Sequence, residues 1–170
     1  MRPSVLNWRS STPSASSGPV LGPNPSTSML LMQRLLNHDL PALPRPSFGI
    51  VDVRDAAELH LRAMTDPAAR GERFLATAGD ALWVSEVARI LHDGLGAAGK
   101  RVPTRELPNF VVRALALFNP SVRSMVHDLG VFKLLSNQKA RTVLRWQPRS
   151  PEEALIEMGE SLLQRGLVSR

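Results

Sequence analysis

Apolar residues recur along this chain at helical spacing in short runs, and proline or glycine separates one run from the next. The spacing and the capping residues together predict a series of amphipathic helices. These helices begin at Ser26, Asp52, about residue 81, Pro108, Ser136 and Ser150. The best-defined start is Ser150, because Pro151 follows at the first helical position and Glu153 stands three residues after the cap. We expect this last helix to stop at Gly166.

Two of the helices carry a clear apolar stripe. The stripe over 81–93 consists of Val84, Val87, Ala88 and Leu91, and Gly94 is its natural stop. The helix capped by Asp52 has a predicted buried face of Val53, Ala56, Ala57, Leu61 and Met64. His60 falls on that stripe, where a hydrogen-bonded core histidine is the leading interpretation and a catalytic role is the alternative.

Between the helices, short apolar runs predict three or four strands. The runs lie at residues 19–21, 48–51 and 73–76, and Val102-Pro103 is a candidate edge strand because proline cannot donate to a ladder. The serine- and proline-rich residues 1–18 are predicted to be irregular. The chain is therefore a helix-rich α/β protein with too few strands for a complete doubly wound sheet, which indicates part of a larger fold.

Composition removes several classes of chemistry. The 170 residues contain no cysteine, which excludes disulfides, thiol nucleophiles and cysteine-ligated zinc. They also contain no tyrosine, so this chain alone cannot use a tyrosine acid. No apolar run approaches the length of about 18 residues that spans a bilayer, and the start lacks a secretory hydrophobic region. We expect a cytoplasmic protein without membrane partners.

The positive charge is concentrated in one part of the chain. The formal net charge is +6, and residues 100–149 hold ten Lys and Arg against Glu106 and Asp128. A solvated basic face, or a face for an acidic partner, explains this cluster best, and a phosphate-bearing ligand is the alternative. Nucleic acid is not favoured, because no aromatic platform interleaves with the basic residues.

Two local motifs resemble functional sites but lack the required context. Residues 94–100 match both glycine-rich phosphate loops, yet a helix precedes them where a strand should, so a helix end and a flexible connection are expected. Three His-Asp pairs stand at predicted helix ends, where the helix dipole favours histidine. They are His38-Asp39, His92-Asp93 and His127-Asp128, and no metal site is predicted from them.

A longer series of segments resembles a known family. It consists of Val20-Leu21-Gly22-Pro23, Ser28, residues 48–57 with Val51-Asp52-Val53-Arg54-Asp55, His60, Gly71-Glu72-Arg73-Phe74, Ala88-Arg89-Ile90-Leu91, Val102-Pro103, residues 136–140 and residues 144–149. In this order they resemble the C-terminal half of extended short-chain dehydrogenases. The similarity is to the dihydroflavonol-reductase-like branch of the NAD-dependent epimerase/dehydratase family, and it covers about residues 19–166.

The resemblance implies a cofactor site and a substrate lobe. It places Val20, Gly22, Pro23 and Ser28 beside a NAD or NADP cofactor, and it makes residues 19–170 the substrate-binding part. Arg54 is a candidate substrate ligand, although an ion pair at the strand–helix junction is the stronger expectation for it. The family's glycine-rich loop and Tyr-x-x-x-Lys pair are absent, so no catalytic residue is assigned.

The function implied by the resemblance is reduction of a ketone or aldehyde to an alcohol by an NAD(P)-dependent oxidoreductase, or the reaction of an epimerase/dehydratase relative. Without the missing motifs we expect the isolated chain to be inactive, as a truncated or rearranged product or a shortened gene model. A separate Rossmann-domain chain is a candidate partner, and the parent substrate would be a small carbonyl or alcohol. The alternative is a non-enzymatic module that docks a partner or an anionic ligand through its basic face. Exposed apolar strand faces predict a tendency to aggregate.

Overall fold

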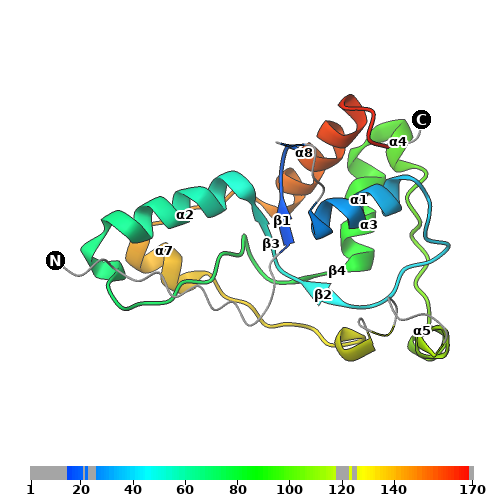
Figure 1. Ribbon diagram of the computed structural model, residues 1–170, viewed down its shortest axis with the longest axis horizontal. Coiled ribbons are helices and arrows are strands. Elements are labelled where there is room, and N and C mark those ends of the chain that lie inside the picture. The colour runs from blue at the N-terminus through cyan, green and yellow to red at the C-terminus, as the bar shows by residue number, and fades with distance from the viewer. Residues whose placement is uncertain (1–14, 21, 23–25, 118–122, 124–125, 169–170) are drawn as a thin grey trace.

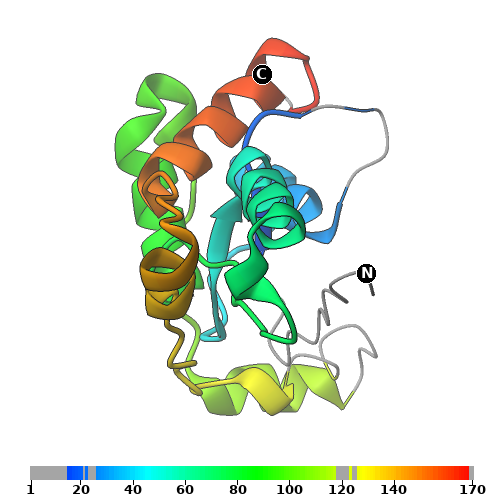
Figure 2. The ribbon, with the colours of Figure 1, turned by 90° about the vertical axis from the view of Figure 1, so that its left-hand side faces the viewer.

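A pair of parallel strands forms the centre of the molecule, and helices lie on both sides of it. The computed structural model describes residues 15–20, 22, 26–117, 123 and 126–168. The elements are β1 (Ala15–Ser17), α1 (Thr27–Leu36), β2 (Ser47–Phe48), β3 (Ile50–Asp52), α2 (Val53–Thr65), η1 (Pro67–Ala69), β4 (Leu82–Trp83), α3 (Val84–Gly94), α4 (Gly96–Gly99), α5 (Asn109–Ala116), η2 (Val126–Asp128), α7 (Gln138–Leu144) and α8 (Pro151–Gln164). Figure 1 shows α2 and α7 on one side of β1 and β3, and α1, α3 and α8 on the other. The side view in Figure 2 places α5 and η2 at the end of the molecule opposite α8. This arrangement confirms the expected helix-rich α/β class.

The central pair consists of β1 and β3, which run parallel. Ala15 lies opposite Ile50 and Ser17 lies opposite Asp52. The strand predicted at 19–21 is wrong at residues 19 and 20, which form no strand, and residue 21 lies outside the described residues. The strand lies instead at 15–17, where the sequence predicts irregular structure, and residues 1–14 of that segment lie outside the described residues. Gly18 explains the boundary, since its φ of +107° turns the chain out of the extended conformation.

Of the other three strand predictions, the one at 48–51 is confirmed in part and those at 73–76 and 102–103 are wrong. The run 48–51 is extended but divides at Gly49, because β2 pairs antiparallel with β4 while β3 pairs with β1. The run 73–76 contains the buried Phe74 and Ala76 yet forms no strand. The predicted edge strand at 102–103 is wrong as well, because the Val102 N–H donates to the Gly99 carbonyl in a turn. An isolated bridge between Leu43 and Glu106 stands nearby instead.

Side-chain caps start three of the helices as the sequence predicts. Ser26 accepts from the Met29 N–H at 3.3 Å at the start of α1, and Ser150 accepts from the Glu153 N–H at 3.1 Å at the start of α8. Asp52 accepts from the N–H at position 54 at 2.8 Å. Each cap satisfies a helix N–H that has no carbonyl partner within the helix.

The larger core lies where α1, α3 and α8 meet. The predicted stripe of α3 is confirmed, since its four members are all buried. Leu91 packs in one cluster with Leu35 from α1 and with Leu155 and Leu162 from α8. This core packs α8 against α1 and α3, and α8 also contacts β1.

A second, smaller core lies under α2, where it contacts α7. It centres on the fully buried Trp146 and includes Leu59, Ala63 and Leu144. The predicted face of α2 is wrong, because Leu61 and Met64 are 63 % and 66 % exposed. Two apolar stripes run along this helix, and packing buries the one through Leu59 and Ala63. Within the described residues, no helix is both long and apolar enough to cross a bilayer.

Candidate functional site

Asp52 is the centre of a charged cluster at the carboxyl ends of the two parallel strands. Its side chain is fully buried, and it belongs both to the end of β3 and to the start of α2. Besides capping α2, it accepts from Arg54 Nε at 2.9 Å and from Arg54 Nη2 at 2.7 Å. This two-point ion pair confirms the expectation that Arg54 stabilises the strand–helix junction.

A second arginine reaches the same carboxylate from the segment before α8. Arg149 Nη1 lies 2.8 Å from Asp52 Oδ1 and 3.4 Å from Asp55 Oδ1, and the Arg149 N–H donates to Asp55 Oδ2 at 2.9 Å. Arg149 Nη1 has no aligned hydrogen-bond acceptor, so its contact with Asp52 is one of charge. We call Asp52, Arg54, Asp55 and Arg149 the Asp52 cluster. Its two carboxylates and two guanidinium groups balance in charge.

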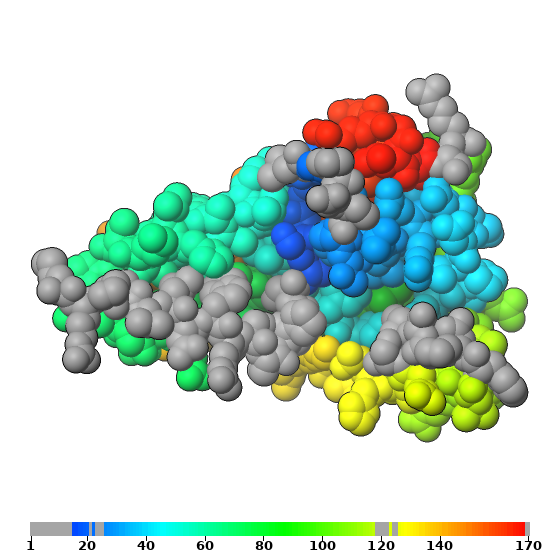
Figure 3. Space-filling view, in the orientation of Figure 1, coloured from blue at the N-terminus to red at the C-terminus, as the bar shows by residue number. Residues whose placement is uncertain are grey.

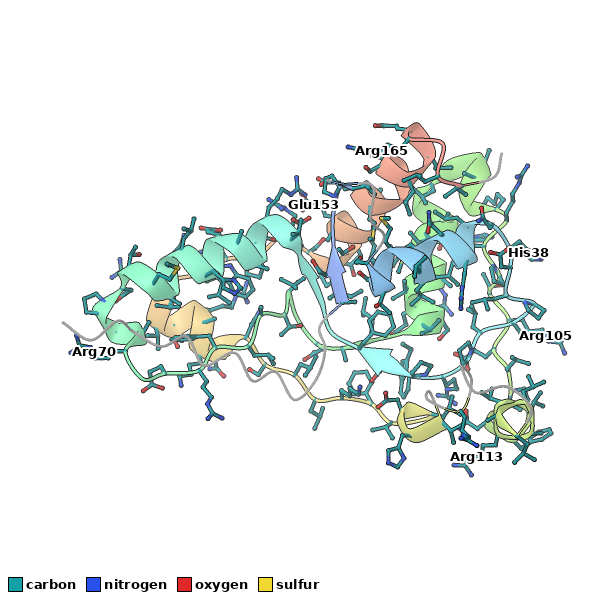
Figure 4. The ribbon with its side chains drawn as sticks, viewed as in Figure 1. His38, Arg70, Arg105, Arg113, Glu153 and Arg165 are labelled. Atoms are coloured by element: carbon teal, nitrogen blue, oxygen red, sulfur yellow. The ribbon has the colours of Figure 1, made fainter. Side chains whose placement is uncertain are left out.

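Helix α8 contacts both arginines of the Asp52 cluster through its glutamates. Arg54 Nη2 donates a hydrogen bond to Glu157 Oε2, and Glu153, labelled in Figure 4, has its Oε1 3.9 Å from Arg149 Nε. The spacing of the sequence predicts the capping role of Asp52, but it does not reveal Arg149, which is almost a hundred positions away. The nearest signal is the segment 144–149, which belongs to the family resemblance.

The environment of Asp52 keeps its carboxylate ionised. Burial acts to raise the pKa of Asp52, but the hydrogen bonds from Arg54 and the charges of Arg149 and Arg54 outweigh it, so the pKa lies below its usual value. The group is thus a permanent anion at neutral pH. It is suited to holding two cations in place and unsuited to exchanging a proton with a substrate.

The lowered pKa of Asp52 predicts a loss of stability in acid. In the unfolded chain this carboxyl binds a proton at higher pH than in the fold, so the free energy of unfolding should fall as the pH drops below about 4. Urea unfolding measured at neutral pH and near pH 3 tests this expectation. Asp52→Asn, which cannot titrate, should lose less stability over the same interval, and an equal loss would contradict the assignment.

The segment after β1 packs tightly against this cluster. A Cβ atom on Gly18 would lie 2.6 Å from Asp52 Oδ2, so only glycine fits there. The buried Ser17 hydroxyl donates to the Ala154 carbonyl of α8 at 3.1 Å. Figure 3 shows β1 as the deep blue strip between α2 and α1 on this face of the molecule.

The residues expected to line a cofactor are largely occupied by contacts within the chain. The Val20 N–H donates to Ser161 Oγ at 3.0 Å, and the Val20 side chain is buried. The Ser28 hydroxyl donates to the Ser16 carbonyl at 2.5 Å. Beside Gly22 there is open space, because a Cβ atom there would meet nothing within 4 Å. Pro23, the fourth expected residue, lies outside the described residues.

Within the described residues, this segment therefore leaves few polar groups free to bind a dinucleotide on its own. Two of the expected donors already have partners, and the Arg54 guanidinium binds two carboxylates. The glycine run at 94–100 does not form a phosphate-binding loop either, because it joins helix α3 to helix α4. There a Cβ atom on Gly99 would lie 2.4 Å from the Leu91 carbonyl oxygen, so the glycine serves helix packing and the expected flexible connection is wrong. In the described part of the chain, no three acidic or histidine side chains gather to hold a metal ion.

The arrangement of these elements is found in solved reductases and epimerases. No protein-family profile matches the sequence, and no curated protein matches it. The protein gox2253 is 20 % identical, with a TM-score of 0.69 over 92 % of this chain and 50 % of its own. Gre2 of Candida albicans, solved with NADPH, is 19 % identical, with a TM-score of 0.62 over 89 % of this chain and 42 % of its own. PA4631, a nucleoside-diphosphate-sugar epimerase from Pseudomonas aeruginosa, is 20 % identical, with a TM-score of 0.66 over 84 % and 44 %.

These likenesses have a common pattern. Each covers most of this chain, yet the chain spans only half of the matched protein or less. At such identities the comparison establishes the fold alone. The chain therefore shares the fold of about half of each of these solved proteins.

Proposed function

We propose that residues 19–170 are the C-terminal, substrate-binding part of an NAD(P)-dependent oxidoreductase of the extended short-chain dehydrogenase type. The observation that carries this proposal is that nearly the whole chain superposes on half or less of proteins such as Gre2, which is solved with NADPH. The segments that resemble the dihydroflavonol-reductase-like branch support the same assignment. The parent reaction would be reduction of a ketone or aldehyde to an alcohol, or that of an epimerase/dehydratase relative.

In this proposal the chain supplies one wall of a cleft and no reacting group. The segment with Val20, Gly22, Pro23 and Ser28 would face the cofactor in the complete protein, and the lobe after residue 81 would face the substrate. Arg54 would reach a substrate only by exchanging one of its carboxylate partners, and its half-exposed side chain allows this. The glycine-rich loop and the Tyr/Lys pair would come from a separate Rossmann-domain chain.

Titration of the purified chain with NADPH and then NADH by calorimetry tests whether this chain needs a second chain to bind the cofactor. We expect no saturable binding of either cofactor, because the polar groups of the proposed wall already have partners within the chain. Gre2 of Candida albicans serves as the positive control. Micromolar, saturable binding by this chain would contradict the proposal, since it would mean that this half builds a cofactor site unaided.

The alternative is a non-enzymatic module that uses the basic face. The net charge of +8 within residues 100–149 favours it. Two measurements distinguish these functions. The first is reductase activity of this chain after a second chain with the glycine-rich loop and the Tyr/Lys pair is added, and the other is RNA binding by this chain alone. Reductase activity that depends on both chains would support the oxidoreductase part, whereas tight RNA binding with a steep salt dependence would support the basic module.

A further inference from the structure

A hollow of about 290 Å³ lies between α5 and η2, far from the Asp52 cluster. It is lined by Arg113, Ala116, Leu117, Arg123, Val126 and His127. Figure 1 shows α5 and η2 next to each other at the lower right of the molecule, while β1 and β3 lie at its centre. The hollow is thus separate from the wall assigned to the cofactor. Its size is near the lower end of the range for small-molecule sites.

The basic side chains of this hollow are not neutralised by the rest of the described chain. The side chains of Arg113, Arg123 and His127 form no hydrogen bond or ion pair with another described residue. The acidic neighbour in sequence, Asp128, is already paired with Lys133 at 3.1 Å. Elsewhere arginines of this protein find carboxylates, as Arg62 does with Glu58 and Arg45 with Glu106. Figure 4 labels Arg113 at α5, beside the η2 turn.

The remaining lining of the hollow is apolar. Ala116 is buried, Val126 is half-buried, and Leu117 is 79 % exposed. A ligand that matches both parts has an anionic head for the guanidinium groups and an apolar body for the leucine and valine. Two guanidinium groups and an imidazole provide many N–H donors in planar arrays, which suit the three terminal oxygens of a phosphate ester better than the two of a carboxylate.

We infer that the α5–η2 hollow binds a small organic phosphate monoester. Arg113 and Arg123 hold the phosphate, His127 adds a donor, and Leu117 and Val126 contact the organic part. The hollow lies in the lobe after residue 81, but it shares no residue with the Asp52 cluster or with the expected cofactor segment of Val20, Gly22, Pro23 and Ser28. The inference is argued from the lining of the hollow alone, so it does not depend on the proposed oxidoreductase function.

Calorimetric titration of the full chain with phenyl phosphate at low salt tests the inference. Arg113→Gln and Arg123→Gln are each expected to weaken binding by about tenfold, because each removes a charge-assisted contact. Arg141→Gln on α7 is the matched control, since Arg141 is exposed, has no described partner and carries the same charge. It should leave the affinity unchanged, and far-ultraviolet circular dichroism of each variant verifies that the helices are intact.

Two further ligands test the basic and the apolar parts of the hollow one at a time. Inorganic phosphate has the head without the apolar body, and benzyl alcohol has the body without the head, so both should bind more weakly than phenyl phosphate. Equal affinity for inorganic phosphate would overturn the apolar part of the inference. Absence of saturable binding up to about 10 mM, or an equal loss in all three arginine variants, would overturn the site itself, the latter by revealing a general charge effect.

Discussion

Replacing Gly18 with alanine should destabilise this chain by about 3 kcal/mol, a large loss for one methyl group. Gly18 has a φ of +107°, which an L side chain rarely adopts, and a Cβ atom there would lie 2.6 Å from Asp52 Oδ2 and 3.0 Å from its Cγ. The carboxylate cannot move aside, because Arg54 holds both of its oxygens. The methyl group would therefore separate β1 from β3 or break the ion pair.

The urea midpoint of Gly18→Ala, read by circular dichroism, measures this loss. Gly79→Ala is the control, because Gly79 has no positive φ and a Cβ atom there would meet nothing within 4 Å. It should leave the midpoint nearly unchanged. If both variants unfolded at the wild-type midpoint, the close packing of Gly18 on Asp52 would be wrong.

Asp52→Asn is the second substitution with a large expected effect. Asparagine has the same shape and can still cap α2, but it leaves Arg54 and Arg149 without their buried counter-charge. Breaking a fully buried ion pair costs about 3–5 kcal/mol, and the partial exposure of both arginines reduces our expectation to about 2 kcal/mol.

Urea unfolding at neutral pH measures the effect of Asp52→Asn, with Asp93→Asn as the control. Asp93 is an exposed carboxylate that pairs with His92 at the end of α3, so its loss should leave the free energy of unfolding nearly unchanged. If the two variants proved equally stable, the Asp52 cluster would contribute no more than a surface pair.

The accuracy of the sequence-based predictions follows the range of the interactions that decide each element. The cap at Ser150 and the stripe of α3 depend on residues within one or two turns, and both predictions are confirmed. The failure at β1 has the opposite cause. Ala15–Ser17 contains no β-branched or aromatic residue, and only its pairing with β3 makes it a strand.

The candidate site shows the same limit. Asp52 and Arg54 stand two residues apart, so their ion pair could be predicted from a strand followed by a helix. Arg149, Ser161 and Glu157 come to the site through the packing of α8, which no local pattern determines. The prediction of the buried face of α2 is wrong for a related reason. Two apolar stripes run along this helix, and only tertiary packing decides which of them is buried.

The contacts of β1 with α8 also govern the order in which this protein can fold during synthesis. The Ser17 hydroxyl binds the carbonyl of Ala154, and the Val20 N–H binds Ser161, so the partners lie 137 and 141 residues apart. Such distant contacts close late, because the loop between them must be ordered first. On the ribosome, α1 can pack against α3 early, but the part of its apolar side that contacts α8 stays uncovered until α8 has emerged. Chaperone binding in that interval should therefore concentrate on α1, and release should follow the emergence of α8 from the ribosome.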